Sequence, residues 1–164
     1  PFAAKDHFQR GNEFVSAGEF DKAVIEYQAA LEQDPNDVDI LTNLGVAYYS
    51  LGKLDEAIEQ YQRALALAAS DADIHSNLGA AYTQKYLLSQ NSADLDKALE
   101  EYLTAVNLDA ELAEAHFGLG VIYLQIGEKE KAITSFESFL KLDSGRDPIA
   151  SSQARQYLED LGGP

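Results

Sequence analysis

The chain has 164 residues, of which 12 are Lys or Arg and 28 are Asp or Glu, and its formal net charge is −16. This length corresponds to one domain, and the negative charge repels phosphates, so we discount DNA, RNA and anionic membrane surfaces as partners. No Cys is present, which excludes disulfides and thiol chemistry, and no apolar run approaches the ~20 residues of a membrane span.

The first residues show no recognisable signal peptide. The chain begins at Pro1 and contains no Met, so we expect the native start to lie further upstream. A cytoplasmic location is favoured, and an exported or membrane-anchored full-length form remains an open alternative.

The predicted elements are pairs of helices that recur along the chain. The four units cover residues 4–37, 38–71, 72–112 and 113–146. In each unit, apolar residues recur three and four apart, which is the period of a helix and not of a strand. Glycines such as Gly52 predict a tight turn between the two helices of a pair.

Small residues repeat at fixed intervals. Gly11, Gly45 and Gly79 are separated by 34 residues, and Gly120 follows 41 residues after Gly79. A fixed period of this size is typical of a solenoid. Because Gly and Ala let two helix backbones approach closely, we expect the aromatic rings to fill the gaps between neighbouring pairs.

The third unit contains seven extra residues between its two helices. The apolar first half of this insertion predicts about one more turn of helix, and the polar second half predicts a loop with a cap at Asn91 or Ser92. Tyr86, Leu87 and Leu88 are a possible second contact surface. The alternative is a neutral insertion in a tolerant loop.

A last helix is predicted at about residues 148–161, with Asp147 as N-cap and Pro148 in the first turn. We expect its apolar side, including Ile149, to cover the open face of the fourth unit, and its polar side, including Ser151, to face water. The end of a solenoid needs such a cap.

The pattern L-G-x-x-Y, then G, then A-x-x-x-Y-x-x-A resembles the tetratricopeptide repeat (TPR). In the second unit it consists of Leu44, Gly45, Tyr48, Gly52, Ala57, Tyr61 and Ala64. The resemblance covers four repeats and implies an all-α fold, a right-handed α-solenoid of antiparallel helix pairs that forms a single domain over residues 1–164. The closing Pro of the repeat survives only as Pro35.

The resemblance also implies a concave groove, lined by the first helix of each pair, that binds an extended or helical peptide. In the family, certain positions of the first helix face this groove. In this sequence those positions are occupied by Lys5, Phe8, Gln9, Asn12, Asp39, Thr42, Asn43, Val46, Tyr49, Asp73, Ser76, Asn77, Ala80, Gln84, Glu114, Phe117, Val121 and Leu124.

Asn43 and Asn77 are the most informative of these residues, because a carboxamide can bind the C=O and N–H of a peptide at once. The alternative is that both only satisfy local polar groups or face water. An extended peptide advances ~3.3 Å per residue and the units stack about 10 Å apart, so four units would hold roughly ten to twelve residues.

The charged positions oppose an acidic ligand. Family members that bind the C-terminal carboxylate of chaperones use basic residues, whereas this chain has Phe8, Asp73 and Asn77 at those places. The acidic row Asp39, Asp73 and Glu114 favours a ligand with Lys or Arg, or serves only to stabilise three helix N-termini. We therefore expect a neutral-to-basic, partly apolar ligand.

Catalytic and metal-binding patterns are not found. His7, His75 and His116 share one offset, but units stacked about 10 Å apart cannot bring their rings to one ion, and we expect them to fill packing positions. No phosphate-binding loop or nucleophile motif is present. The sequence therefore predicts a non-enzymatic module without cofactor or metal, acting as a protein-binding adaptor or scaffold. A self-assembling homo-oligomer and a regulatory arm of a larger protein are the alternatives.

Overall fold

The computed structural model describes residues 3–162; residues 1–2 and 163–164, the two ends of the predicted domain, lie outside the described residues. Over residues 3–162 the chain forms nine helices and no strand, which confirms the all-α prediction. The helices are α1 (Ala4–Ser16), α2 (Phe20–Gln33), α3 (Val38–Ser50), α4 (Leu54–Leu67), α5 (Ala72–Ser89), α6 (Ser92–Leu108), α7 (Ala113–Ile126), α8 (Lys129–Asp143) and α9 (Pro148–Asp160).

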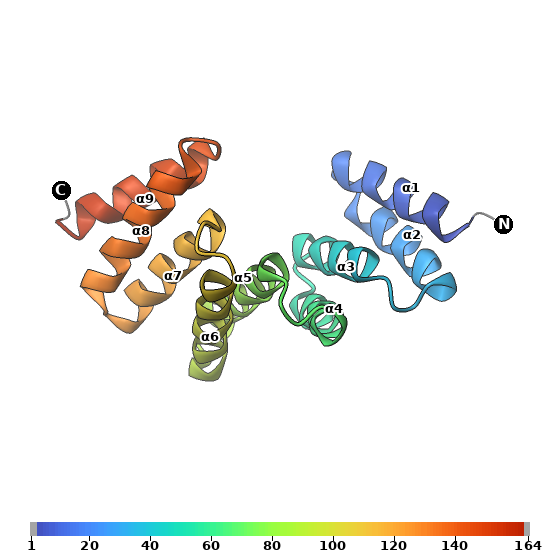
Figure 1. Cartoon of the computed structure of the whole chain (residues 1–164), viewed down its shortest axis with the longest axis horizontal. Coiled ribbons are helices and arrows are strands. Elements are labelled where there is room, and N and C mark those ends of the chain that lie inside the picture. The colour runs from blue at the N-terminus through green and yellow to red at the C-terminus, as the bar shows by residue number, and fades with distance from the viewer. Residues whose placement is uncertain (1–2, 163–164) are drawn as a thin grey trace.

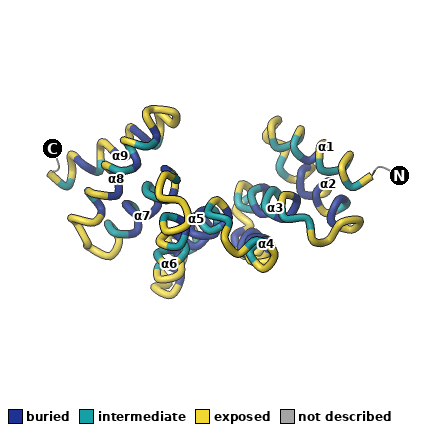
Figure 2. The backbone as a smooth tube through the Cα atoms, in the orientation of Figure 1, coloured by how far each residue is buried: buried dark blue, intermediate teal, exposed yellow. Residues whose placement is uncertain are grey.

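The helix pairs follow one another along an arc, and the two ends of the chain lie at its two ends (Figure 1). Each helix packs mainly against the helices next to it in the sequence. Buried segments lie where neighbouring helices face each other, and exposed segments lie at the turns (Figure 2). Gly18, Gly52 and Gly127 adopt a left-handed conformation in three of the turns, with φ of 73°, 72° and 84°, which a residue with a side chain would resist.

The core of each pair is an aromatic ring packed on a glycine of the first helix. A Cβ atom at Gly11 would lie 2.4 Å from the ring of Tyr27, and one at Gly45 would lie 2.5 Å from Tyr61. Only glycine therefore permits these close approaches. The same relationship recurs in the third and fourth units. The prediction that the rings fill the gaps between neighbouring pairs is therefore wrong in part, since each ring packs within its own pair and Tyr102 also reaches Gly118 of the next pair.

The insertion in the third unit is almost entirely helical. Helix α5 has 18 residues and α6 has 17, whereas α3 and α4 have 13 and 14. The predicted lengthening of the first helix is confirmed, and Asn91 is the N-cap of α6. The predicted polar loop is wrong in its length, because only Gln90 and Asn91 separate the two helices.

Helix α9 begins as predicted, with the Asp147 side chain accepting hydrogen bonds from the backbone N–H groups of Ile149 and Ala150. Its apolar side covers the fourth unit as predicted, with Leu158 buried and Tyr157 and Leu161 partly buried against the core. The prediction is wrong at two positions, since Ile149 is 73% exposed and Ser151 only 1%. The Ser151 hydroxyl donates to Oδ2 of Asp143 at the end of α8 (2.9 Å), which turns this side of α9 inward. Ile149 lies two residues earlier, about 200° around the helix, and so faces solvent.

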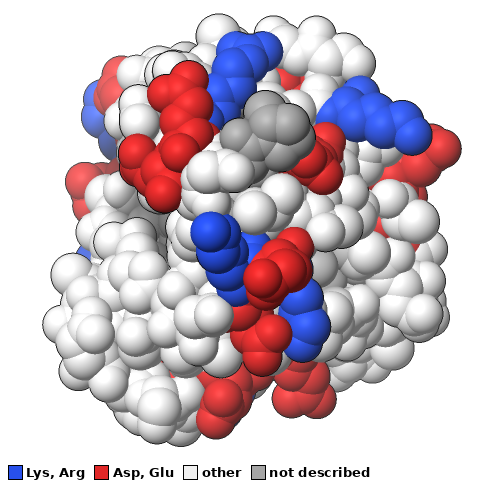
Figure 3. Space-filling model, turned by 90° about the vertical axis from the view of Figure 1, so that its left-hand side faces the viewer, with Lys and Arg blue, Asp and Glu red and all other residues white. Residues whose placement is uncertain are grey.

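No helix among residues 3–162 is both long and apolar enough to cross a membrane. The surface at the C-terminal end carries acidic and basic side chains interspersed, beside a broad area without charged side chains (Figure 3). The acidic side chains on this face are therefore not gathered into a single patch.

Candidate functional site

A cavity of about 660 Å³ lies in the C-terminal half of the arc. We call it the groove cavity. Helices α5, α7 and α9 supply most of its walls. Its lining consists of Tyr49, Ser76, Asn77, Ala80, Thr83, Gln84, Leu87, Tyr102, Glu114, Phe117, Gly118, Val121, Phe139, Asp143, Asp147, Ala150, Gln153 and Tyr157.

The lining residues of α5, α7 and α9 recur three and four apart on each helix. This spacing places them on one stripe of each helix. The three stripes face the same space, so α9 continues the row of first helices beyond the fourth unit. The tail helix forms a wall of the cavity and leaves the space between the walls open.

The floor of the groove cavity is formed by Tyr102. Its ring packs between Gly79 of α5 and Gly118 of α7, where added Cβ atoms would lie 3.0 Å and 2.2 Å from ring atoms. Burial raises the pKa of the Tyr102 hydroxyl, and a hydrogen bond with Thr83 partly opposes this rise. The floor is thus an aromatic ring whose hydroxyl group stays uncharged at pH 7.

The two sides of the groove cavity differ in character. Near the N-terminal ends of α7 and α9 the charged lining groups are Glu114, Asp143 and Asp147, and no Lys, Arg or His lines the cavity. Toward the C-terminal ends of the helices the lining includes the apolar side chains of Leu87 and Val121. The cavity therefore has an acidic edge and an apolar edge.

Asp143 is a fixed negative charge on the acidic edge. Burial tends to raise the pKa of this carboxyl, but hydrogen bonds from the Asp147 amide, the Ser151 hydroxyl and the Gly145 amide outweigh it and lower the pKa. The Asp147 N–H lies 3.1 Å and 3.2 Å from the two carboxylate oxygens of Asp143. The same carboxylate therefore anchors α9 and charges the cavity wall.

Acidic groups also gather at the N-terminal ends of α5 and α7. Partial burial raises the pKa of Asp73, and the negative charges of Asp71, Glu114 and Asp109 raise it further. Asp73 does not line the groove cavity, but its interaction with Glu114 shows that this end of the groove lies in a negative potential.

The predicted groove residues of the N-terminal half are arranged differently. The Tyr27 hydroxyl and Nδ2 of Asn43 both donate to Oδ1 of Asn12, at 2.6 Å and 3.2 Å. The ring of Phe8 packs on that of Tyr27, with centroids 6.0 Å apart. Asn12 and Asn43 therefore satisfy local polar groups, whereas Asn77 lines the groove cavity.

The structure thus divides the predicted site residues into two groups. Those that line the groove cavity are Tyr49, Ser76, Asn77, Ala80, Gln84, Glu114, Phe117 and Val121, together with Leu87 of the predicted second contact. Those that lie elsewhere are Lys5, Phe8, Gln9, Asn12, Asp39, Thr42, Asn43, Val46, Asp73 and Leu124, and also Tyr86 and Leu88.

Sequence reasoning missed the contribution of α8 and α9 to this cavity. Ala150, Gln153 and Tyr157 recur three and four apart, as the lining residues of α5 do. That spacing was a usable signal, because a capping helix with a groove-facing stripe is a further first helix. No comparable pattern marks Asp143, whose place on the wall depends on the packing of α8.

Models of one repeat family match most of the chain. The TPR repeat model matches residues 11–52, 47–85 and 94–127, and the Tetratricopeptide repeat model matches residues 113–146. The chain belongs to the tetratricopeptide repeat family. No curated protein sequence compared with this TPR chain matches it.

Solved TPR structures share the fold. TTC0263, a thermophilic TPR protein in Thermus thermophilus, is 23% identical, with a TM-score of 0.85 over 98% of this chain and 84% of that chain. MamA is 28% identical, with a TM-score of 0.73 over 93% of this chain and 84% of that chain. The first TPR of Spaghetti (RPAP3), bound to HSP90 peptide SRMEEVD, is 27% identical, with a TM-score of 0.68 over 76% of this chain and 93% of that chain.

These matches confirm the predicted TPR solenoid of helix pairs. A TPR fold is a protein–protein interaction module, which points to protein or peptide partners, and TPR proteins are generally not enzymes. Among residues 3–162, no group of three or more His, Asp or Glu side chains could hold a metal ion.

Proposed function

We propose that this TPR chain is an adaptor or scaffold whose groove cavity binds a peptide segment of a protein partner. The observation that carries the proposal is the cavity of about 660 Å³ on the stripes of α5, α7 and α9, with polar groups at defined points of an apolar lining. Concave sites of this kind are the usual places where ligands bind.

The lining favours a neutral-to-basic and partly apolar segment. Glu114, Asp143 and Asp147 attract Lys or Arg at the acidic edge, and Phe117 and Val121 offer apolar contact for an anchoring side chain. An acidic segment would meet carboxylates with no cation in the lining to compensate them. We therefore expect the SRMEEVD peptide, which the Spaghetti TPR binds, not to bind in the groove cavity.

Asn77 supports recognition of the peptide backbone. Its carboxamide is half-buried in the wall of the groove cavity, and it has both a donor and an acceptor to offer. The backbone groups that it would bind are common to all sequences. Asn77 thus contributes affinity, whereas the acidic and apolar edges contribute selectivity.

Selection from a random peptide library on the immobilised protein tests the proposal, followed by Kd measurements for the selected peptides. We expect enrichment of Lys or Arg together with aromatic or aliphatic residues. Asn77→Ala combined with Phe117→Ala is expected to weaken binding roughly 10- to 100-fold. Asn107→Ala, on the exposed side of α6, is the matched control. Acidic peptides whose binding is lost in the Asn77→Ala and Phe117→Ala variant, or equal binding by both variants, would overturn the proposal.

Self-assembly is a second candidate, because several apolar side chains face solvent. Leu88 of the insertion is 72% exposed and Ile149 of α9 is 73% exposed. Apolar surface of this kind favours contact between copies. Sedimentation velocity over a wide range of concentrations distinguishes the two candidates. A strict monomer that still binds selected peptides removes self-assembly, and loss of association in Leu88→Ser supports it.

A further inference from the structure

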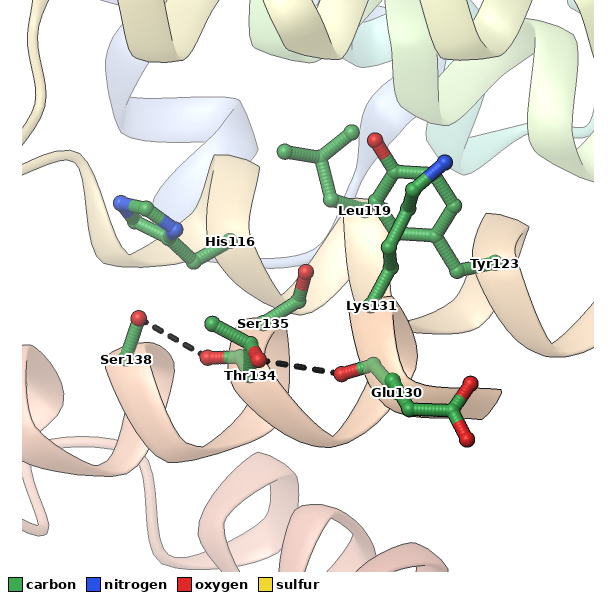
Figure 4. A pocket seen from close by; sticks show the side chains of 8 residues that line it. All are labelled: His116, Leu119, Tyr123, Glu130, Lys131, Thr134, Ser135 and Ser138. Carbon is green, nitrogen blue, oxygen red and sulfur yellow. Dashed lines mark hydrogen bonds between the residues drawn. The ribbon is translucent and has the colours of Figure 1, made fainter. Parts of the chain in front are cut away.

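A second cavity, of about 370 Å³, lies between α7 and α8 and shares no lining residue with the groove cavity. We call it the outer pocket. Its lining consists of His116, Leu119, Tyr123, Glu130, Lys131, Thr134, Ser135 and Ser138 (Figure 4). Comparison with the other units shows that two side-chain partners present elsewhere are missing at this place.

The first missing partner is a carboxylate. In the first unit Nδ1 of His7 lies 2.7 Å from Oε2 of Glu26, 19 residues later. In the third unit Nδ1 of His75 lies 2.6 Å from Oε2 of Glu101, at the same offset once the seven inserted residues are allowed for. In the fourth unit the residue 19 positions after His116 is Ser135.

The histidine of the fourth unit nevertheless keeps its other contact. Nε2 of His116 lies 2.9 Å from the carbonyl oxygen of Ala110, just as Nε2 of His75 lies 3.1 Å from that of Ala69. A carbonyl only accepts, so Nε2 carries a proton in both rings. The ring of His116 is thus held in the orientation that, in the third unit, presents Nδ1 to a carboxylate.

The second missing partner is an amide. Nε2 of Gln28 donates to the Tyr48 hydroxyl at 2.9 Å, and Nε2 of Gln62 donates to the Tyr82 hydroxyl at 3.2 Å, each across 20 residues. The residue 20 positions before Tyr123 is Leu103. Among the described residues, neither Nδ1 of His116 nor the Tyr123 hydroxyl has a hydrogen-bond partner within the chain.

The remaining polar groups of the outer pocket favour an anion. The Ser135 hydroxyl is directed into the space between His116 and Tyr123, and the carboxylate of Glu130 points away from His116 (Figure 4). Nζ of Lys131 lies 5.5 Å from the centre of the Tyr123 ring. The pocket therefore presents the Ser135 hydroxyl and the His116 imidazole, with the Lys131 ammonium group over the Tyr123 ring.

We propose that the outer pocket binds the carboxylate of a glutamate side chain from a protein partner, in the place that Glu26 and Glu101 occupy in the first and third units. The Nδ1 side of the His116 ring faces the carboxylate as it does in the third unit, the Ser135 hydroxyl donates to the same group, and the side-chain methylenes lie on Leu119. The net charge of −16 opposes acidic partners at long range, so this contact selects a partner and adds little affinity. It is independent of the groove cavity.

The test titrates the protein with N-acetyl-glutamate-N-methylamide while NMR follows the ring signals of His116 and the backbone amide of Ser135. Saturable shifts are expected with this probe and not with the glutamine counterpart. Ser135→Glu rebuilds the pair of the first and third units, so it should fold, fill the pocket and weaken binding at least roughly tenfold. Ser152→Glu, which adds the same charge on the exposed side of α9, is the matched control.

Three outcomes would overturn the proposal. The first is equal binding of the probe by the protein and by its Ser135→Glu variant. The second is binding of inorganic phosphate without binding of the glutamate probe. The third is binding of acetate as tightly as the probe, because acetate lacks the methylene groups that contact Leu119. Peptide binding in the groove cavity should be unchanged by Ser135→Glu, so the two proposals fail separately.

Discussion

The ring of Tyr102 occupies the space that a side chain at Gly118 would need, with a Cβ atom at Gly118 placed 2.2 Å from Cζ of Tyr102. In the third unit Asn77 stands at the offset of Gly118, as Asn43 does in the second. Gly118 therefore lets α7 approach α6 closely and leaves the wall above Tyr102 without a side chain. This pair of residues sets the depth of the groove cavity.

The first prediction follows from that approach. Gly118→Ala should destabilise the protein by about 1–3 kcal/mol, because the buried Tyr102 ring cannot move without disturbing α5 and α7. Urea unfolding followed by circular dichroism measures the change. In a Tyr102→Leu background the same substitution should cost less. Equal costs in both backgrounds would contradict the close contact.

The second prediction concerns the shared acceptor of the first two units. Asn12→Ala should cost about 1–3 kcal/mol of stability, since the buried Tyr27 hydroxyl would lose its acceptor. The cost should shrink in a Tyr27→Phe background. Asn107→Ala is the matched control on an exposed site of α6. Equal losses for Asn12→Ala and Asn107→Ala would refute the structural role of Asn12.

The third prediction is a loss of stability at high pH. Burial raises the pKa of Tyr27 to about 12 and also raises the pKa values of Tyr61 and Tyr102. A raised pKa in the folded state gives stability that is complete below pH about 10 and is lost as the pH rises through 12. Ultraviolet titration should show these tyrosines ionising together with unfolding. Ionisation of all nine tyrosines near pH 10 in the folded protein would contradict it.

The fourth prediction concerns the attachment of α9 in acid. Hydrogen bonds to Asp143 lower its pKa below the ordinary 3.8, so its contribution is present above pH about 4 and is lost as the pH falls further. Asp143→Asn should lower the Tm at pH 7, and the difference from the natural chain should vanish in strong acid. Asp96→Asn, on the exposed side of α6, is the control. A Tm difference that is independent of pH would argue against the carboxylate.

The fold was predictable because its determinants lie at fixed offsets. The glycines, alanines and aromatic rings recur in every unit, so the periodicity alone indicated the helix pairs. The packing of each ring on the glycine of its own pair appeared only in the structure. The inward position of Ser151 on α9 was not predictable in this way. It depends on one hydrogen bond from Ser151 to Asp143, and no repeat of that pair exists elsewhere in the sequence to reveal it.

The residues of the candidate site could be predicted only in part from their positions within the repeat. Asn43 and Asn77 share an offset, yet Asn43 donates to Asn12 while Asn77 lines the groove cavity. The two asparagines differ because the unit before Asn43 supplies Asn12 as an acceptor for its side chain. The histidines show the same limit, since their packing positions were expected but their carboxylate partners were found only in the structure.

The longer helices of the third pair affect how the helix pairs stack on one another during folding. Alike hairpins can stack out of order during folding, which leads to trapped or exchanged assemblies. Helices α5 and α6 exceed α3 and α4 by five and three residues, and Lys85 near the end of α5 reaches Asp55 of α4 at 2.6 Å. If the pairs stacked in the wrong order, that ion pair would be lost and the ends of the longer helices would have no neighbour to pack against. The length of the third pair therefore favours the native order of stacking.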